Sequence, residues 1–340
     1  MNRILYFLFI VGCCSCTGSN ETEKYQGTRD KVIHVRDKVE EIKIEDPLIG
    51  SYALVHVMDE YLFIRDVRPF DKYIHLFDKN NFGYISSMAK RGQGPEEITN
   101  MGSINIDEAK RKFYVTDHGK QKVLSYDLDS VLTYASSYTP RVKMGIDEFL
   151  FPDYYQILND SISICRIIQP IGSNNFKPTV GKMNMNTGEI ELMKYEHPKI
   201  IGRKRISVVA SIEHGIYVEY YHNHDLMTIC NLDGDLICNI YGPDWIDGSE
   251  REGVYYSYYG GMIFCGDKIY AAYSGERSIT EKGQASWPTK LLVFDLQGNY
   301  IQTLETGLHI SNFCYDKENN RIILSLNDDI QFGYLPLDGF

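Results

Sequence analysis

A pattern that recurs about every fifty residues constrains the fold of this 340-residue chain more than any other feature of its sequence. Each copy is a polar turn followed by a short run of apolar and β-branched residues, as in DEYLFIRD (59–66) and EHGIYVEY (213–220). Equivalent positions in the six copies are 51, 49, 54, 53 and 53 residues apart: Leu62, Phe113, Ile162, Ile216, Ile269 and Ile322. Six near-equal periods of short strands are typical of a β-propeller and not of a β-sandwich.

A second pattern indicates how the strands within one period are joined. TICNLDGDLI (228–237) and LVFDLQGNYI (292–301) each place a turn glycine between two apolar runs, which is a hairpin signature, and VLSYDLDSVL (123–132) is a weaker copy. Tyrosine is abundant, at 26 residues, and aromatic residues favour strands. We therefore predict an all-β fold, a six-bladed β-propeller with four-stranded antiparallel blades. The predicted blades cover about 51–89, 101–139, 151–195, 207–241, 255–305 and 309–338.

The last predicted blade lacks one strand, because the chain ends directly after its third strand. Either KVIHV or EIKIE, both within residues 31–46, can supply the missing strand. Closing the last blade with an N-terminal strand removes an exposed sheet edge. The propeller is therefore expected to span residues 31–340.

The N-terminus has the pattern of an export signal. MNRILYFLFIVGCCSC combines one cation, Arg3, with an apolar run that is too short to span a bilayer. The run ends in Ile-Val-Gly-Cys, which resembles a bacterial lipobox. We expect residues 1–12 to be a lipoprotein signal peptide and Cys13 to carry the lipid. Cys16 is the alternative attachment site, and an ordinary cleaved signal is the alternative to lipidation.

The residues after the signal and the overall composition indicate the location of the protein and argue against one class of partner. Residues 13–30 are polar and lack periodicity, as expected of a tether between a lipid anchor and a domain. The predicted location is the cell envelope, on the periplasmic or the surface side of the outer membrane. The net charge of −11 argues against a nucleic-acid partner.

Spacing of the reactive residues predicts no catalytic set, no cofactor and no metal site. Five widely spaced cysteines follow the signal, and none forms a CxxC pair. They are Cys165, Cys230, Cys238, Cys265 and Cys314. No Ser/His/Asp or Cys/His arrangement can be assembled from spacing alone.

The stretch AKRGQGPEEITN (89–100) has the glycines of a phosphate-binding loop but not its chemistry. A Walker-type loop ends in Gly-Lys-Ser/Thr, whereas a proline and two glutamates follow the second glycine here. Carboxylates repel phosphate, and proline lacks a backbone N–H. We therefore interpret the stretch as a blade connector, in which glycines give backbone freedom and proline sets the exit direction. Its motif residues are Arg91, Gly92, Gly94, Pro95 and Glu97.

The connector and the blade that follows it resemble a known family. RGQGPEE followed by INIDEAKRKFYVTDHGKQKVLSYDLDS is similar to the six-bladed, TolB-like propeller lipoproteins of Bacteroidota, in which an R-G-x-G-P-x-E loop precedes a blade of this form. The resemblance covers nearly all of the mature chain, and the loop is its specific motif. It implies the fold, the envelope location and the lipid anchor, but no particular activity.

Loop lengths predict which face of the propeller binds a ligand. The connections from fourth to first strand and from second to third strand leave the same face, and the long predicted loops are of these two kinds. Six aromatic residues fall on that face: Trp245, Trp287, Tyr255, Tyr256, Tyr258 and Tyr259. Flat amphipathic rings beside polar groups suit a sugar or an extended peptide. The alternative is that the tyrosines pack between blades.

We therefore expect a lipid-anchored, non-catalytic binding protein of the cell envelope. Its expected partner is a glycan, a peptide or an envelope protein, bound on the long-loop face. The alternative function is that of a metal-dependent hydrolase or lyase acting at the mouth of the channel. Three or more inner-strand side chains able to hold a divalent ion would favour the enzyme.

Overall fold

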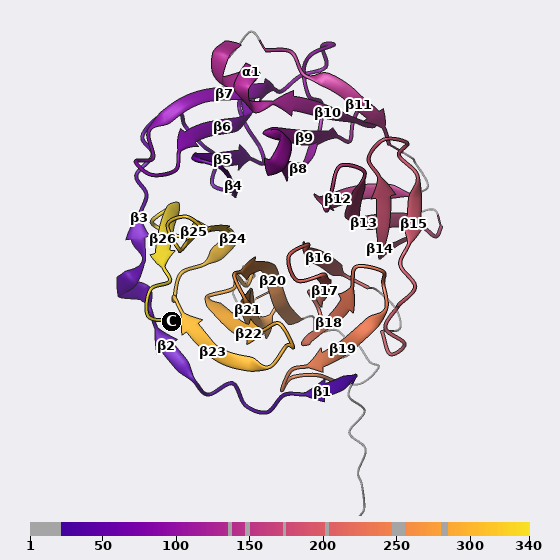
Figure 1. Cartoon of the computed structure of the whole chain (residues 1–340). Coiled ribbons are helices and arrows are strands. Elements are labelled where there is room, and N and C mark those ends of the chain that lie inside the picture. Colours follow the sequence, from indigo (N-terminus) through magenta and orange to yellow (C-terminus); the bar gives the residue numbers. More distant parts are fainter. Residues whose placement is uncertain are drawn as a thin grey trace, which may run out of the picture.

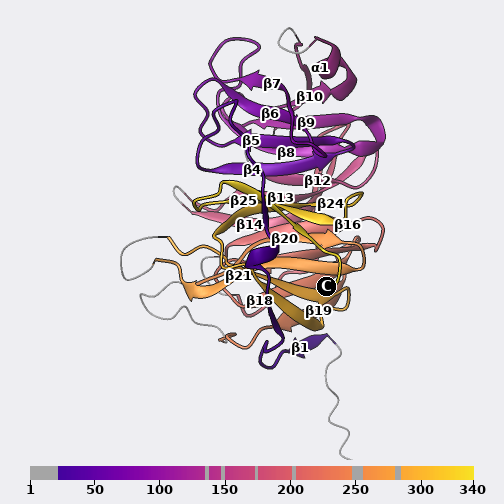
Figure 2. The same ribbon diagram turned by 90° about the vertical axis from the view of Figure 1, so that its left-hand side faces the viewer.

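Six β-sheets stand around a central axis, so the chain is an all-β, six-bladed β-propeller, as predicted (Figure 1). The computed structural model describes residues 22–134, 138–146, 150–172, 175–200, 204–246, 256–279 and 285–340. Viewed from the side, the blades form the wall of a short cylinder (Figure 2). Cys13 and Cys16 lie outside the described residues.

Each blade is an antiparallel sheet whose first strand is innermost. Blade 1 contains β4 (Ala53–Met58), β5 (Tyr61–Asp66), β6 (Lys72–Asp78) and β7 (Tyr84–Lys90). Blade 2 contains β8 (Met101–Asp107), β9 (Lys112–Asp117), β10 (Lys122–Asp127) and β11 (Arg141–Gly145). Blade 3 contains β12 (Phe151–Ile157), β13 (Ile162–Pro170), β14 (Phe176–Asn184) and β15 (Ile190–Leu192).

The second half of the ring repeats this arrangement. Blade 4 contains β16 (Ile206–Ser211), β17 (Ile216–Tyr221), β18 (Leu226–Asn231) and β19 (Leu236–Tyr241). Blade 5 contains β20 (Tyr256–Cys265), β21 (Lys268–Arg277), β22 (Lys290–Asp295) and β23 (Tyr300–Glu305). Blade 6 contributes β24 (Ile310–Asp316), β25 (Arg321–Leu326) and β26 (Phe332–Pro336).

A short helix interrupts blade 2, so its predicted end at residue 139 is wrong. Helix α1 (Leu128–Tyr134) follows β10 directly, where the sequence pattern predicted a hairpin turn. The Asp127 carboxylate starts the helix by accepting hydrogen bonds from Ser130 N and Oγ at 2.9 and 2.7 Å. Leu128 and Val131 are buried at helical spacing. The fourth strand therefore forms only after the helix, at β11.

The core lies between adjacent sheets, where apolar side chains from both blades meet. Between blades 1 and 2, the rings of Phe63 and Phe113 are 5.1 Å apart, and Tyr126 stacks on Phe113 at 4.8 Å. All three side chains are almost completely buried. Such aromatic pairs add to the stabilisation from apolar burial.

The N-terminal segment runs along the outside of three blades (Figure 1). Strand β1 (Glu23–Tyr25) pairs in parallel with β19 of blade 4, and β2 (Val32–His34) pairs in parallel with β23 of blade 5. After a 3₁₀ turn, β3 (Glu40–Glu41) pairs antiparallel with β26 and becomes the fourth strand of blade 6. The predicted closure of the last blade is confirmed. The closing strand, β3, overlaps the start of EIKIE, whereas KVIHV pairs with blade 5.

Residues 22–30 were predicted to belong to a polar tether, and this part of the prediction is wrong. The Glu23 carboxylate accepts hydrogen bonds from Asn239 Nδ2 at 2.9 Å and from the Tyr241 hydroxyl at 2.5 Å. The Arg29 side chain is buried and pairs with the buried Asp225 at 3.0 Å. Polar contacts hold most of this segment on the propeller. Because it has no apolar periodicity, the sequence pattern does not reveal that it docks there.

A buried ion-pair network joins the last blade to the first. Lys79 Nζ lies 3.1 Å from Asp316 Oδ1, and both side chains are nearly inaccessible to solvent. Arg321 donates to Asp316 Oδ2 at 2.9 Å and to the Lys79 carbonyl at 2.5 Å. Because a buried ion pair needs such additional hydrogen bonds to offset desolvation, the network fixes blade 6 against blade 1 in one geometry.

The closure predicts an unequal response to two apolar substitutions in the N-terminal segment. Ile42 is 3% exposed beside β3, whereas Val32 is 45% exposed on β2. Ile42→Ala should lower the free energy of unfolding by about 2–4 kcal/mol, because it leaves a cavity at the closed edge. Val32→Ala should change it by less than about 0.5 kcal/mol. Urea denaturation measures both, and equal losses would show that the segment does not close the ring.

Candidate functional site

The long described connections lie on the predicted face, with one exception. Residues 91–100, 193–205, 242–255 and 278–289 connect fourth to first or second to third strands. The exception is the connection of 128–140 within blade 2, which contains α1 and lies on the opposite face. Of the long loops, residues 201–203, 247–255 and 280–284 lie outside the described part.

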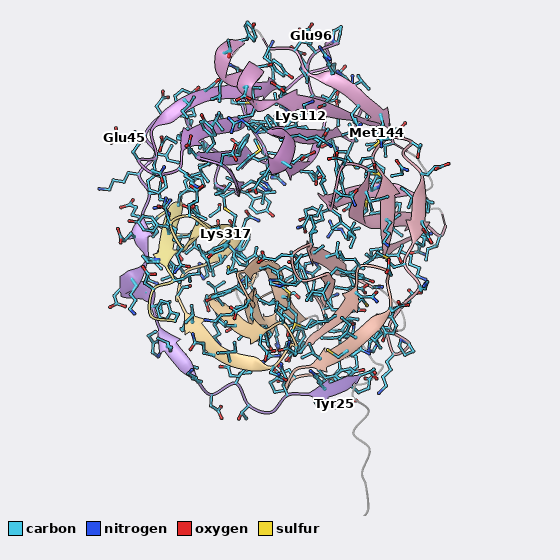
Figure 3. The ribbon with its side chains drawn as sticks, viewed as in Figure 1. Tyr25, Glu45, Glu96, Lys112, Met144 and Lys317 are labelled. Carbon is cyan, nitrogen blue, oxygen red and sulfur yellow. The ribbon has the colours of Figure 1, made fainter. Side chains whose placement is uncertain are left out.

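Trp245 belongs to the periphery of blade 4. Its ring lies 4.8 Å from that of Tyr241 and 5.9 Å from that of His197. Tyr241 ends β19 and stacks on Tyr25 of β1 at 4.5 Å. Figure 3 shows Tyr25 at the outer edge of the propeller. Trp245 lies in a connection from fourth to first strand, as predicted, and packs near the N-terminal strand at the outer side of blade 4.

The predicted tyrosine cluster divides into core and surface residues. Tyr258 and Tyr259 are 4% and 0% exposed and pack between blades 4 and 5. The Tyr259 hydroxyl donates to Asp225 Oδ1 at 3.1 Å. The prediction that these two rings bind a ligand is wrong, because neighbouring blades already cover them. Tyr256 is half-buried and stacks on Tyr258, and Tyr255 lies outside the described residues.

Trp287 lines a cavity of about 600 Å³ on the long-loop face, between blades 5 and 6. The other cavity walls are mainly polar: Ser274, Glu276, Ala285, Ser286, Thr289, His309 and Asn327. The ring of Tyr52, from the start of blade 1, lies 6.2 Å from that of Trp287. An aromatic ring with several hydrogen-bonding groups around it has the composition of a sugar-binding site.

Backbone hydrogen bonds hold the Trp287 segment in place. The Pro288 carbonyl accepts from Ile310 N at 2.8 Å, and the Thr289 carbonyl accepts from Thr306 N at 3.0 Å. On the other side, Ser286 Oγ lies 2.9 Å from Ser274 Oγ. The ring is therefore positioned before any ligand arrives, which lowers the entropic cost of binding.

The connector motif lies where it was predicted, between β7 and β8, and Figure 3 shows Glu96 at the outer edge. Arg91 donates to the Pro69 carbonyl at 3.0 Å. The Glu97 carboxylate folds back into the loop and accepts from Gly94 N at 2.9 Å and from Lys90 Nζ at 2.8 Å. The loop thus uses its own carboxylate to satisfy the backbone N–H of Gly94.

The reason for the two glycines differs from the predicted one. Neither Gly92 nor Gly94 has a positive φ, so backbone freedom is not what the loop needs. Instead, a Cβ on Gly92 would lie 1.9 Å from Glu97 Oε2, and one on Gly94 would lie 3.1 Å from the same atom. The glycines provide space for the carboxylate.

The glycine result predicts a compensating double substitution. Gly92→Ala should cost about 1–3 kcal/mol of stability, because its methyl group displaces the Glu97 carboxylate. In a chain that already carries Glu97→Ala, Gly92→Ala should cost much less, since the obstacle has been removed. A double-mutant cycle in urea measures the coupling between the two residues. Additive losses would refute the steric explanation.

All six blades line a central channel that contains a cavity of about 540 Å³. Its wall includes one or more residues from each blade: His56, Glu108, Tyr154, Ser207, Gly261 and Asn312. Lys317, which also lines it, lies beside the central opening in Figure 3. The channel is therefore accessible and lined by both polar and aromatic groups.

An arginine network crosses blades 3, 4 and 5 at the wall of this channel. Arg166 pairs with both Asp153 oxygens, at 2.6 Å from Nη2 and 2.9 Å from Nε, and donates to Ser207 Oγ at 2.6 Å. Ser207 Oγ is 2.9 Å from His222 Nε2, and His222 Nδ1 is 2.6 Å from the Tyr259 carbonyl. Since a carbonyl only accepts, Nδ1 carries the proton and Nε2 accepts from the serine.

Unlike Arg166, three polar side chains of blades 1 and 2 each have a buried nitrogen atom without a hydrogen-bond partner. Arg65 Nη2 donates to the Met101 carbonyl at 2.7 Å, but its Nε is buried without a partner. The buried Nε2 atoms of His56 and His118 have no partner either. Burial lowers the pKa of both histidines. The charge of Arg65 lowers the pKa of His56 further, whereas the Asp153 carboxylate opposes the lowering at His118. The pKa of His56 is about 4.

Two buried aspartates, one next to Arg65 and one next to His118, accept hydrogen bonds from the backbone of nearby loops. Asp66, next to Arg65, accepts from Gly50 N at 2.8 Å and from Arg68 N at 2.9 Å. Asp117, next to His118, accepts from Thr99 N, Asn100 N and Gly119 N at 3.0–3.1 Å. Each aspartate ends the second strand of its blade and ties the incoming loop to that strand. Sequence reasoning missed this role, although FIRD and YVTD both show an aspartate at the strand end.

Within the described ranges, no group of three or more His, Cys, Asp or Glu side chains is arranged to hold a metal ion. Asp153 is paired with Arg166, and the two nitrogens of His222 contact Ser207 and the Tyr259 carbonyl. The five described cysteines form no disulfide. The same part of the chain contains no helix of the length and hydropathy needed to cross a bilayer.

The depressed pKa of His56 predicts acid sensitivity. Below its usual value of about 6.5, the unfolded chain takes up a proton at His56 before the folded chain does. Stability should therefore fall as the pH decreases from about 6.5 to about 4. In His56→Gln, the loss between pH 7 and pH 4.5 should be smaller by roughly 1–3 kcal/mol.

The matched control is His34→Gln, which alters an exposed histidine on β2. Urea denaturation at the two pH values measures all three proteins. His34→Gln should lose as much stability as the unaltered chain. If His56→Gln did so too, His56 would not be the group that resists protonation.

Comparison with known families agrees with this architecture. Residues 43–139 match the family DUF5128, described as a 6-bladed beta-propeller. No curated protein matches the sequence.

Solved structures with a similar fold come from several bacteria. A member of the duf4221 family from Bacteroides vulgatus has a TM-score of 0.55 at 12% identity, covering 88% of this chain and 98% of that one. A protein described as exported, from Bacteroides fragilis, has a TM-score of 0.56 at 12% identity, covering 90% and 88%. The calcium-binding protein regucalcin from Agrobacterium tumefaciens has a TM-score of 0.54 at 10% identity, covering 90% and 95%.

At these identities, the likeness to solved structures shows the fold alone. The blade arrangement and the match over residues 43–139 agree, and the chain has the six-bladed β-propeller fold.

Proposed function

We propose that this protein is a non-catalytic, lipid-anchored binding protein of the cell envelope that recognises a glycan on the long-loop face of the propeller. The observation that carries the proposal is the Trp287 cavity, which combines a half-buried indole ring with serine, glutamate, histidine and asparagine side chains. A sugar presents both an apolar ring face and hydroxyl groups, so such a cavity satisfies both of its surfaces.

The cavity suits a glycan better than an extended peptide. A bound peptide commonly adds a strand to a free sheet edge, whereas β1, β2 and β3 cover the outer edges of blades 4, 5 and 6. The cavity lies between the ends of two blades and offers mainly side chains. Recognition by an aromatic ring and side-chain hydrogen bonds is therefore the mode that its walls support.

The envelope location rests on the N-terminal sequence, and an exported protein is among the similar folds. With lipid on Cys13, only the nine residues 14–22 separate the anchor from β1. Such a length spans at most about 30 Å when fully extended. The proposed tether is therefore short, and it leads to the outer edge of blade 4, which is held close to the membrane.

Trp287→Ala tests the proposed site in a screen of neutral and acidic glycans against the mature protein. The variant should weaken glycan binding by about 1–3 kcal/mol, the usual cost of removing an aromatic anchor. Its melting temperature should change little, because the Trp287 backbone is held by contacts that the substitution leaves intact. Isothermal titration calorimetry measures the affinity.

Trp245→Ala is the matched control, since it removes the other tryptophan of the chain. It should lower the melting temperature, because Trp245 packs on blade 4, and leave glycan affinity unchanged. If Trp287→Ala bound every glycan as well as the unaltered chain, or if only peptides bound, the proposed function would be wrong.

A further inference from the structure

A row of rings leads from the N-terminal strand across the outer part of blade 4. The ring of Tyr25, on β1, stacks on that of Tyr241 at 4.5 Å, and the ring of Trp245 lies 4.8 Å from that of Tyr241. The His197 ring lies 5.9 Å from that of Trp245. Tyr25 is 65% exposed and lies at the outer edge of the propeller (Figure 3). The row therefore begins at the surface, where the N-terminal segment joins the blades.

His197 also lines a cavity of about 420 Å³, which extends the row toward blade 3. Ile171 and Phe176, at the connection between β13 and β14, are 64% and 61% exposed and form part of its wall. This connection and the one that contains His197 both leave the long-loop face. Rings and cavity thus form one contiguous group on blades 3 and 4. We call its solvent-facing members the apolar rim: Tyr25, Ile171, Phe176, Ile200 and Trp245.

The charged groups that line this cavity are already paired. Lys204 Nζ lies 2.8 Å from Glu219 Oε1, and both side chains are nearly inaccessible to solvent. Lys177 Nζ lies 2.7 Å from Glu196 Oε2. Burial lowers the pKa of His197 to about 4, so its ring is neutral at pH 7. The cavity therefore does not select a charged ligand, and its apolar wall is what it offers to a partner.

The composition of the apolar rim is that of residues at a membrane surface. Exposed apolar side chains are usually scattered singly, whereas a group of them indicates an interaction surface. Tryptophan and tyrosine rings beside aliphatic side chains are enriched where lipid headgroups meet acyl chains. Lys24 precedes Tyr25, and Lys177 follows Phe176. Lysine stems can lie along an apolar surface while their ammonium groups stay in water, so these neighbours suit the same environment.

The proposed lipid anchor identifies the bilayer as the partner. Residues 14–22 span at most about 30 Å between a lipid on Cys13 and β1. Tyr25, where the apolar rim begins, is the last residue of β1. So short a link gives the rim a high effective concentration of lipid surface. The Trp287 cavity, between blades 5 and 6, shares no residue with the rim, so the two proposed sites are separate.

We propose that the apolar rim lies in the surface of the membrane that holds the anchor, with Ile171 and Phe176 reaching the acyl chains and Tyr25 and Trp245 at the level of the headgroups. The inference rests on the proposed lipid anchor and not on glycan recognition. Because the charges of the cavity are paired, the contact depends on apolar burial and not on anionic lipid. It fixes the orientation of the propeller on the membrane, which a tether alone would leave free.

Fluorescence quenching tests the contact in the lipidated chain, reconstituted into phosphatidylcholine vesicles. In a Trp287→Phe background, Trp245 is the only tryptophan. Lipids with brominated acyl chains should quench its fluorescence, because bromine acts only at short range. Replacing part of the phosphatidylcholine by phosphatidylglycerol should leave the quenching unchanged.

Two substitutions of exposed phenylalanines make a matched pair in the same background. Phe176→Asp should abolish the quenching, because a charge among the acyl chains is costly. Phe70→Asp is the control, since Phe70 is fully exposed in the connection between β5 and β6 of blade 1. It should leave the quenching unchanged. Both side chains are exposed, so neither substitution should lower the melting temperature.

The outcomes separate this inference from the proposed function. Absence of quenching in the lipidated Trp287→Phe chain would overturn the inference and leave anchor and glycan recognition standing. Equal quenching in Phe176→Asp would also overturn it, since the contact would then not use the rim. A mature chain whose mass shows no lipid would contradict both the anchor and the inference. A chain that sediments as a dimer, and as a monomer only in Phe176→Asp, would show that a second copy covers the rim and not the bilayer.

Discussion

Closure of the ring is the constraint on which the rest of this structure depends. Six blades around an axis leave the last blade next to the first, and here the last blade has only three strands of its own. Strand β3 supplies the fourth, and the Lys79–Asp316–Arg321 network locks the two blades together. Because an open ring would expose both a sheet edge and the apolar faces of two blades, closure is a condition for every inter-blade contact.

A second requirement arises at the axis, where the inner strand of each blade has one edge without a neighbouring strand. Side chains from adjacent blades satisfy part of these edges. The Gln156 amide pairs with both backbone groups of Ala210, at 2.7 and 2.9 Å, and Asn312 accepts from Val55 N at 2.7 Å. Arg65 and Arg166 serve the same purpose at backbone carbonyls. The polar lining of the channel is thus first of all a structural necessity.

The same necessity places charges in the wall of the channel. An arginine that must reach a carbonyl of the next blade brings a charge into the wall, and burial makes that charge costly without a partner. Blade 3 supplies the partner from a β-bulge, where Asp153 lies beside Arg166, whereas β4 and β5 of blade 1 pair without a bulge and Ala53 lies opposite Asp66. The pKa of Arg166 is accordingly raised and that of Arg65 is lowered.

The sequence by itself determined the number of blades, their antiparallel strands, the need for an N-terminal closing strand and the connector between β7 and β8. Local sequence patterns predict these features, because each blade forms its hairpins from residues that are close in the chain. Only the tertiary structure decided that Tyr259 is core while Trp287 lines a cavity, that Gly92 makes room for Glu97, and that residues 22–30 dock on blades 4 and 5. It also brought Arg65 and His118 together across two blades. The Gly92–Glu97 contact depends on how one loop folds back on itself. The other contacts join residues that are far apart in the chain, and such pairs leave no local pattern in the sequence.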